Sequence, residues 1–252
     1  MMVRMKFIKT GPVKFIGHLD IMRFFQKAVR RAGLDVEYSQ GFNPHQVMSF
    51  ASPLGVGLTS EGEYLDVSFN SLPDKQVLLQ KLNDAMNEFI QVTDMVVLNE
   101  GAKNAMASVA AADYLVSVKD GYEFFGIEEF QKKFTAFMAQ ENITILKKSK
   151  KSEKETDIRP FIYFFAFTDI EFLGEDSAKK SLAESYDNGV KVYLKLSSGS
   201  VDNLKPELVM EAFCEYAGIP YNEFAFQMHR FELYGEAKDR NYIPLSEVGY
   251  EA

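Results

Sequence analysis

The first 98 residues alternate between strand and helix patterns, and their order restricts the fold more than any other feature of the chain. Strand patterns cover residues 3–9, 34–39, 46–52, 63–69 and 91–98, and helical patterns cover residues 17–32 and about 73–89. The resulting β-α-β-β-α-β order, with a lengthened central hairpin, is typical of a ferredoxin-like unit. We therefore predict an N-terminal ferredoxin-like domain over residues 1–100.

The same pattern starts again after residues 101–112, which are small and are expected to form a short helix or a linker. Strands are expected at 113–118, 143–147, 161–167, 190–196 and 225–233, and helices at 128–139 and 206–217. Residues 161–167 are apolar on both faces of a pleat, which predicts a central strand covered on both sides. We predict an α+β protein of two tandem ferredoxin-like halves, the second degenerate and covering residues 113–252.

The composition excludes several classes of protein. No apolar run approaches the roughly 18 residues of a membrane helix, and the first residues lack the apolar core of a signal peptide. The single cysteine, Cys214, excludes an internal disulfide and a multi-cysteine metal site, and it is expected to be buried on an apolar helix face. We expect a cytoplasmic protein with no cofactor and no membrane contact.

Charge is distributed unevenly along the chain. The whole chain has 28 basic and 36 acidic residues, and residues 1–50 hold eight of the basic and three of the acidic ones. The remaining residues therefore hold 20 basic and 33 acidic groups. Segregation of this kind can hold a polyanion against one face of a protein while the rest repels it.

The first helix carries much of this positive charge. Its apolar residues recur at helical spacing, and Gly33 suits the C′ position that ends a helix. Arg23, Lys27, Arg30 and Arg31 recur on another face, at i, i+4, i+7 and i+8. Such a row can follow phosphates. It can equally be a solubilising face paired with neighbouring acids.

Residues 39–45 form a polar loop after this helix. Its backbone N–H groups could bind phosphate while Tyr38 or Phe42 stacks on a base. A hairpin loop with Asn43-Pro44 setting its turn explains the same residues. The predicted RNA-contact or partner-contact residues are Lys14, His18, Arg23, Lys27, Arg30, Arg31, Gln40, Asn43, His45 and Arg159.

His18 and His45 allow a catalytic interpretation, because two imidazoles could divide proton donation and acceptance in RNA cleavage. Packing at a helix start for His18 and a loop hydrogen bond for His45 are the structural alternatives. A metal site of His18, Asp20 and His45 would lack a tight ligand spacing such as His-x3-His, so no metal is expected.

Other charged residues are expected to be structural. Glu61, Glu63 and Asp66 are expected to form ion pairs that neutralise the basic helix, and the alternative is contact with a cationic partner. His229 and Arg230 are expected to be ordinary residues on a sheet surface.

Several motifs between residues 9 and 66 occur together in one bacterial family. They are Lys9-Thr10-Gly11, Phe15-Ile16-Gly17-His18-Leu19-Asp20, Arg30-Arg31-Ala32-Gly33-Leu34, Tyr38-Ser39-Gln40-Gly41-Phe42-Asn43-Pro44-His45 and Ser60-Glu61-Gly62-Glu63-Tyr64-Leu65-Asp66. In these motifs the chain resembles the radical-SAM-linked proteins, a domain of unknown function encoded beside or fused to cobalamin-type radical-SAM enzymes. The chain departs from the family at Gly17, where serine is more frequent, and at Gln46, where a second proline often follows.

The resemblance implies a separately encoded radical-SAM protein as a partner, in RNA or ribosome-related modification. The chain itself lacks the Cys-x3-Cys-x2-Cys ligand set of such enzymes. Arg159, in the family motif Asp157-Ile158-Arg159-Pro160, could extend the basic surface or form a salt bridge with Asp157 or Glu155. We therefore expect a non-catalytic RNA-binding accessory protein. The alternatives are a metal-independent endonuclease that uses His18 and His45, and a purely protein-binding adaptor.

Overall fold

The computed structural model describes residues 1–148, 153–174, 181–199, 202–237 and 241–249. It is an α+β protein with a mostly antiparallel sheet. The chain divides into two compact units, unit 1 formed by Met1–Ala111 and Arg230–Ala252 and unit 2 formed by Ala112–His229. Strands β5 (Val109–Val118) and β10 (Phe226–Glu236) contribute residues to both units.

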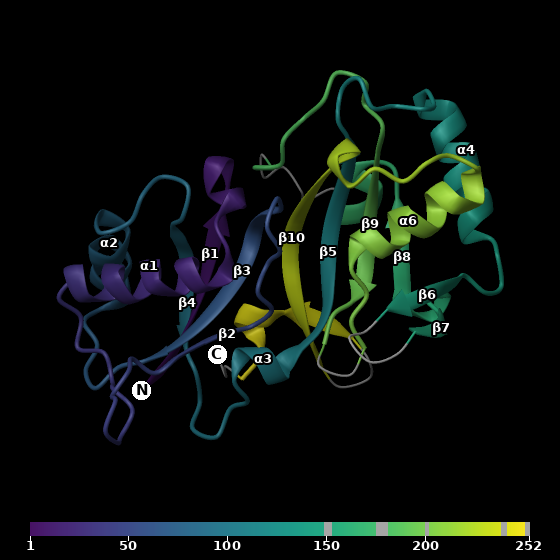
Figure 1. Ribbon diagram of the computed structural model, residues 1–252. Helices are drawn as coiled ribbons and strands as arrows, with labels where there is room; N and C mark the ends of the chain where they lie inside the picture. The colour runs from purple at the N-terminus through teal and green to yellow at the C-terminus, as the bar shows by residue number, and fades with distance from the viewer. Residues whose placement is uncertain (149–152, 175–180, 200–201, 238–240, 250–252) are drawn as a thin grey trace. The chain divides into compact units, whose positions relative to one another are not determined.

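Unit 1 has the β-α-β-β-α-β order of elements that the sequence predicts (Figure 1). Its elements are β1 (Met2–Lys9), α1 (His18–Arg31), β2 (Met48–Phe50), β3 (Thr59–Ser68), α2 (Lys75–Asp84), β4 (Val92–Val97) and α3 (Ala105–Ser108). The strand order is β4-β1-β3-β10, with β2 also paired to β3 and β11 (Tyr242–Pro244) to β10. The pairs β1–β3, β1–β4 and β2–β3 are antiparallel.

One apolar core joins both long helices of unit 1 to its sheet. Alternate residues of β1, among them Phe7, are buried in the same cluster as α1, α2, β3 and β4. The Phe7 ring lies edge-on to Phe25 of α1 with centroids 4.7 Å apart, and Phe50 completes the aromatic group. Gly33 has a φ of 64° just after α1, which confirms its predicted role in ending the helix.

The expected strand at residues 34–39 is wrong. The structure has only isolated bridges there, from Val36 to Phe69 and from Tyr38 to Gln46. The Asp35 carboxylate instead accepts hydrogen bonds from the side chains of Asn70 and Ser71, at 2.9 and 2.8 Å. These local side-chain bonds compete with a continuous strand ladder.

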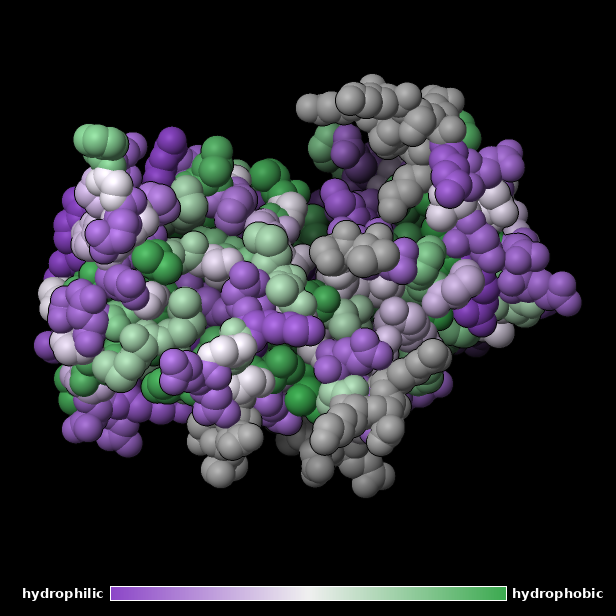
Figure 2. All heavy atoms as spheres, turned by 90° about the horizontal axis from the view of Figure 1, so that it is seen from below, coloured by the Kyte–Doolittle hydropathy of each residue, from purple (hydrophilic) through white to green (hydrophobic). Residues whose placement is uncertain are grey.

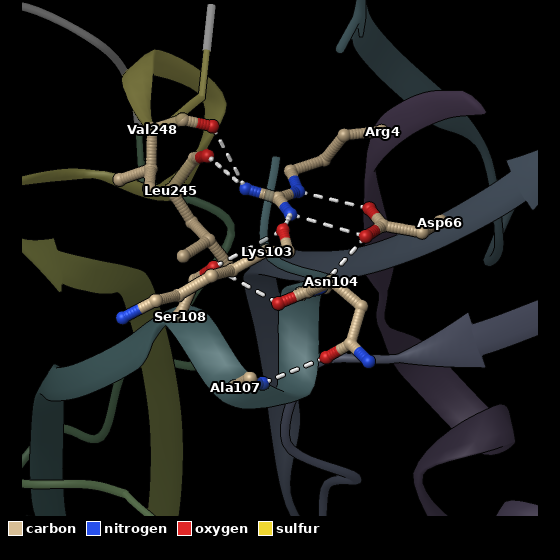
Figure 3. Close-up of polar contacts among 9 residues, drawn as sticks. Arg4, Asp66, Lys103, Asn104, Ala107, Ser108, Leu245 and Val248 are labelled. Atoms are coloured by element: carbon tan, nitrogen blue, oxygen red, sulfur yellow. Dashed lines mark hydrogen bonds and ion pairs between the residues drawn. The ribbon is translucent and has the colours of Figure 1, made fainter. Parts of the chain in front are cut away.

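A buried ion pair fixes the C-terminal segment of unit 1 (Figure 3). The Arg4 guanidinium makes two hydrogen bonds to Asp66, at 2.8 and 3.0 Å. Its other three N–H groups point to the carbonyl oxygens of Leu245, Val248 and Lys103, at 3.0–3.1 Å. All five donors of this arginine are thus used, so the pair is fully satisfied.

Unit 2 contains α4 (Ile127–Met138), β6 (Thr144–Lys148), β7 (Glu153–Asp157), β8 (Ile162–Ala166), α5 (Asp169–Leu173), β9 (Lys191–Ser197) and α6 (Pro206–Ala217). Its strand order is β10-β5-β9-β8, and β6 pairs with β7 in a separate hairpin. Rings of Phe130, Phe134 and Phe137 on α4 pack around Phe213 of α6, with centroids 5.1–5.7 Å apart. The expected helix at 206–217 has the predicted bounds.

The expectation that residues 161–167 form a central strand is wrong. Strand β8 stands at the end of the strand order in unit 2. Tyr163 and Phe164 are 40% and 44% exposed. The Phe164 ring stacks on Phe172 of the short helix α5, with centroids 5.7 Å apart. The apolar run therefore reflects aromatic contacts with a helix that the sequence did not reveal.

Within the described ranges, no helix is long and apolar enough to cross a membrane. The face that Figure 2 presents intersperses hydrophilic with hydrophobic residues.

Candidate functional site

Helix α1 places three basic side chains, Arg23, Lys27 and Arg30, on its exposed side; we call them the basic face. They lie opposite the residues that α1 buries in the core. Arg23 pairs with Asp20 at 3.0 Å, but both side chains are more than 60% exposed, so water screens the pair. Lys27 and Arg30 take part in no ion pair with any residue that the structure describes.

Two further predicted contact residues have structural roles. Arg31 donates to the Ala85 carbonyl at 2.6 Å and so ties the end of α1 to the end of α2. Lys14 lies in a 3-10 helix, Gly11–Phe15, with its ammonium 5.5 Å from the centre of the Phe15 ring. Its carbonyl accepts a hydrogen bond from Gly57 at 2.8 Å.

The loop of residues 39–45, called here the 39–45 loop, is closed at its base by Ser39 and His45. The Ser39 N–H donates to the His45 carbonyl at 2.8 Å, and the Ser39 hydroxyl lies 2.9 Å from His45 Nδ1. Residues 40–45, which include the predicted contacts Gln40 and Asn43, are exposed. Phe42 is fully exposed. Its ring therefore projects from the loop into solvent.

Gln46 ties this loop to the basic helix. Its amide nitrogen donates to the Gln26 carbonyl of α1 at 3.2 Å and to the Tyr38 hydroxyl at 3.4 Å. Gln26 lies within one helical turn of both Arg23 and Arg30. The structure thus brings the base of the 39–45 loop beside the basic face.

His18 lies in a different environment from His45. It is the first residue of α1, and its ring meets Phe50 edge-on with centroids 4.9 Å apart. It lines a narrow cavity with room for about one water molecule, whose other residues are Phe7, Lys9, Ile21, Phe50, Pro53, Leu54 and Glu63. Burial lowers the pKa of the His18 imidazole, and this effect is larger than the opposite effect of the Glu63 carboxylate. The imidazole is therefore neutral at pH 7.

The cavity contains polar groups that sequence reasoning did not select. Glu63 forms a bidentate ion pair with Arg230, with atoms 2.5–2.8 Å apart, and Arg230 also donates to the Ser52 carbonyl. Lys9 is only 2% exposed, and burial lowers the pKa of its ammonium more than the Glu63 carboxylate raises it. We call the space lined by Lys9, His18 and Glu63 the Lys9 cavity. No local signal in the sequence separates Lys9 from Arg4 and Lys6 on the same strand.

Two expectations about charged residues are therefore wrong. His229 and Arg230 are 1% and 2% exposed and do not lie on a sheet surface. Glu63 and Asp66 do form structural ion pairs, but with Arg230 and Arg4 and not with the basic helix. Partners on neighbouring strands satisfy these buried charges, and sequence spacing does not identify such partners.

Arg159 belongs to unit 2 and holds the end of α4. Its Nε donates to the Met138 carbonyl at 3.1 Å, and its backbone N–H donates to the Asp157 carboxylate at 3.0 Å. Cys214 is buried, as predicted, and burial raises the pKa of its thiol to about 11. Among the described residues, no group of three or more histidines, cysteines and acids is placed to hold a metal ion.

The family described as "Uncharacterized protein conserved in bacteria (DUF2344)" matches residues 2–206, most of the chain. The chain belongs to this family. The DUF2344 match includes the basic face, the 39–45 loop and the three residues of the Lys9 cavity, and it ends before Arg230. No match is found among curated proteins.

Proposed function

We propose that this DUF2344 protein is an accessory protein that binds RNA and has no catalytic activity of its own. The observation that carries the proposal is the bond from Gln46 to Gln26, which brings an exposed loop beside an exposed row of cations. Arg23, Lys27 and Arg30 would contact phosphates, and the exposed ring of Phe42 would stack on an unpaired base.

The proposed partner is a separately encoded radical-SAM enzyme. Support comes from the motifs of residues 9–66 that resemble radical-SAM-linked proteins, since the chain has a single cysteine and cannot ligate such a cluster itself. In this proposal the protein presents RNA to that enzyme for modification. Co-purification of the two tagged proteins, with and without ribonuclease treatment, tests the association.

We also propose that both halves are ferredoxin-like. Strand orders of β4-β1-β3-β2 in unit 1 and β10-β5-β9-β8 in unit 2 support a repeated arrangement. In the second half, the β6–β7 hairpin would be an insertion.

The test of RNA binding is charge reversal of the basic face. A variant with Arg23→Glu, Lys27→Glu and Arg30→Glu should retain total bacterial RNA much less than the wild type. The plot of log affinity against log salt concentration should become less steep. Its slope should decrease in magnitude by about 2, because each lost phosphate contact lowers that magnitude by about 0.7. Binding equal to that of the wild type, in a folded triple variant, contradicts the proposal.

A matched control carries the same change of charge on other elements. Lys81→Glu, Lys103→Glu and Lys132→Glu replace three exposed lysines outside α1 and the 39–45 loop. This variant should keep the wild-type salt slope more closely than the α1 variant. Equal losses in the two triple variants would mean that net charge alone governs RNA retention.

RNA cleavage and co-purification test the two alternatives. An endonuclease would cut the RNA in EDTA and would lose that activity in both His18→Ala and His45→Ala. A purely protein-binding adaptor would retain the radical-SAM protein after ribonuclease treatment and would bind RNA only at background level.

A further inference from the structure

The Lys9 ammonium is buried without a carboxylate partner. Its one described hydrogen bond runs to the Lys14 carbonyl at 3.5 Å, which is long for a charged donor. Among the described residues Lys9 forms no ion pair, because both oxygens of the nearby Glu63 carboxylate face Arg230. A buried ammonium with so little compensation is costly unless something else neutralises it.

The Lys9 cavity offers a place for that neutralising group. Lys9, His18 and Glu63 line it, and Phe7, Ile21 and Phe50 form apolar walls. His18 begins α1, so the cavity lies at the N-terminus of a 14-residue helix, where the partial positive charge favours an anion. The cavity has room for about one water molecule, so it can take one oxygen of a carboxylate but not a phosphate group.

Exposed apolar side chains adjoin this cavity along the chain. Phe15, Leu19 and Val56 are 67%, 60% and 61% exposed. The Lys14 carbonyl joins their segments, because it accepts from both the Lys9 ammonium and the Gly57 N–H. A buried charge next to exposed apolar side chains is typical of a protein-binding surface and not of a phosphate-binding one.

We infer that the Lys9 cavity receives one carboxylate oxygen of an aspartate or glutamate from a second protein. The Lys9 ammonium and the His18 imidazole donate hydrogen bonds to it, and Phe15, Leu19 and Val56 pack against apolar residues that flank the acid. This surface is separate from the proposed RNA contacts and does not depend on them.

The test follows the imidazole signals of the full chain by NMR, with the tripeptide N-acetyl-Leu-Asp-Leu-amide as the probe. The chain has three histidines, and His45 in the exposed loop serves as an internal control. The tripeptide should shift the His18 signals in a saturable way and leave those of His45 unchanged. The probe with asparagine in place of aspartate should have little effect.

Two sets of variants test the contacts. Lys9→Met should weaken the tripeptide about tenfold or more, as expected for loss of a charged hydrogen bond, whereas the exposed-lysine control Lys27→Met should not. Phe15→Ala with Leu19→Ala should weaken the tripeptide but leave the weaker effect of sodium acetate unchanged. Because Lys9→Met removes an unpaired buried charge, this variant is expected to fold.

Three results would overturn the inference. One is the absence of any His18 shift with tripeptide and acetate. Another is an unchanged affinity in Lys9→Met. The third is a His18 response to inorganic phosphate without one to acetate, which would make the cavity a phosphate site.

Discussion

Two buried clusters on strand β3 of unit 1 contrast in how completely their charges are satisfied. In the first, the Asp66 carboxylate and three backbone carbonyl groups accept every N–H of Arg4. In the second, Glu63 pairs with Arg230 in the same bidentate manner, but Lys9 beside them has, among the described residues, only a long bond to a carbonyl. The second cluster also adjoins a cavity.

The difference separates a cluster that stabilises the fold from one that retains a poorly compensated charge. A cluster in which every donor has an acceptor has no N–H group available for a ligand, and it contributes only to the fold. A cluster that buries a charge with weak compensation lowers the stability of the fold. Each of the following predictions tests this contrast between the two clusters.

The largest loss of stability is expected in the first cluster, that of Arg4 and Asp66. Asp66→Asn should lower the free energy of unfolding by about 3–5 kcal/mol, because it leaves the Arg4 guanidinium buried without a countercharge. Urea unfolding measures the change. Asp94→Asn is the matched control, since its pair with Lys75 is exposed and should contribute less than about 1 kcal/mol. Similar losses in the two variants would contradict the prediction.

A smaller loss of stability is expected in the second cluster, that of Glu63, Arg230 and Lys9. Glu63→Gln should lower the free energy of unfolding by about 2–4 kcal/mol, because Arg230 and Lys9 then remain as buried cations. Adding Lys9→Met to Glu63→Gln should recover part of the lost free energy of unfolding. A double variant that is less stable than Glu63→Gln alone would show that Lys9 is not a source of repulsion.

Lys9→Met alone should raise the free energy of unfolding by about 1 kcal/mol near pH 7. Burial lowers the pKa of Lys9 below its ordinary value of 10.5, so the unfolded chain binds more protons between the folded pKa and 10.5. Wild-type stability should therefore rise with pH in that window, and the advantage of Lys9→Met should shrink. Thermal unfolding of both proteins between pH 7 and pH 10 measures the trend, and a parallel pH dependence would contradict it.

The smallest effect concerns His18. Burial places its folded pKa below the ordinary value of 6.5, so the unfolded chain takes up the proton first as pH falls. The free energy of unfolding of the wild type should decrease by less than about 1 kcal/mol as the pH falls below 6.5. His18→Gln should lack that part of the drop, whereas His45→Gln should keep it. Identical pH profiles of the two variants would exclude a contribution from His18.

Local patterns predicted several elements well. Apolar spacing and Gly33 located α1, and the bounds of α6 were predicted from Pro206 onward. These features depend on side-chain periodicity and on turn residues, which act within a few positions of the chain. The burial of Cys214 was predicted for the same reason.

Elements that depend on distant partners were predicted poorly. The aromatic run of β8 resembled a central strand, yet it stands at the end of the strand order and packs its rings on α5. The segment at 34–39 made side-chain bonds in place of a strand ladder. In both cases the deciding contacts join segments that local sequence does not link.

The sequence by itself determined the order of helices and strands in the first half, the basic face of α1 and the polar loop that follows it. Only the tertiary structure decided which charges meet, because Arg4 and Asp66, and likewise Glu63 and Arg230, lie far apart in the chain and pair across neighbouring strands. The same pairing leaves Lys9 beside a cavity. A buried charge is defined by the atoms around it, and those atoms are set by the packing of the whole unit.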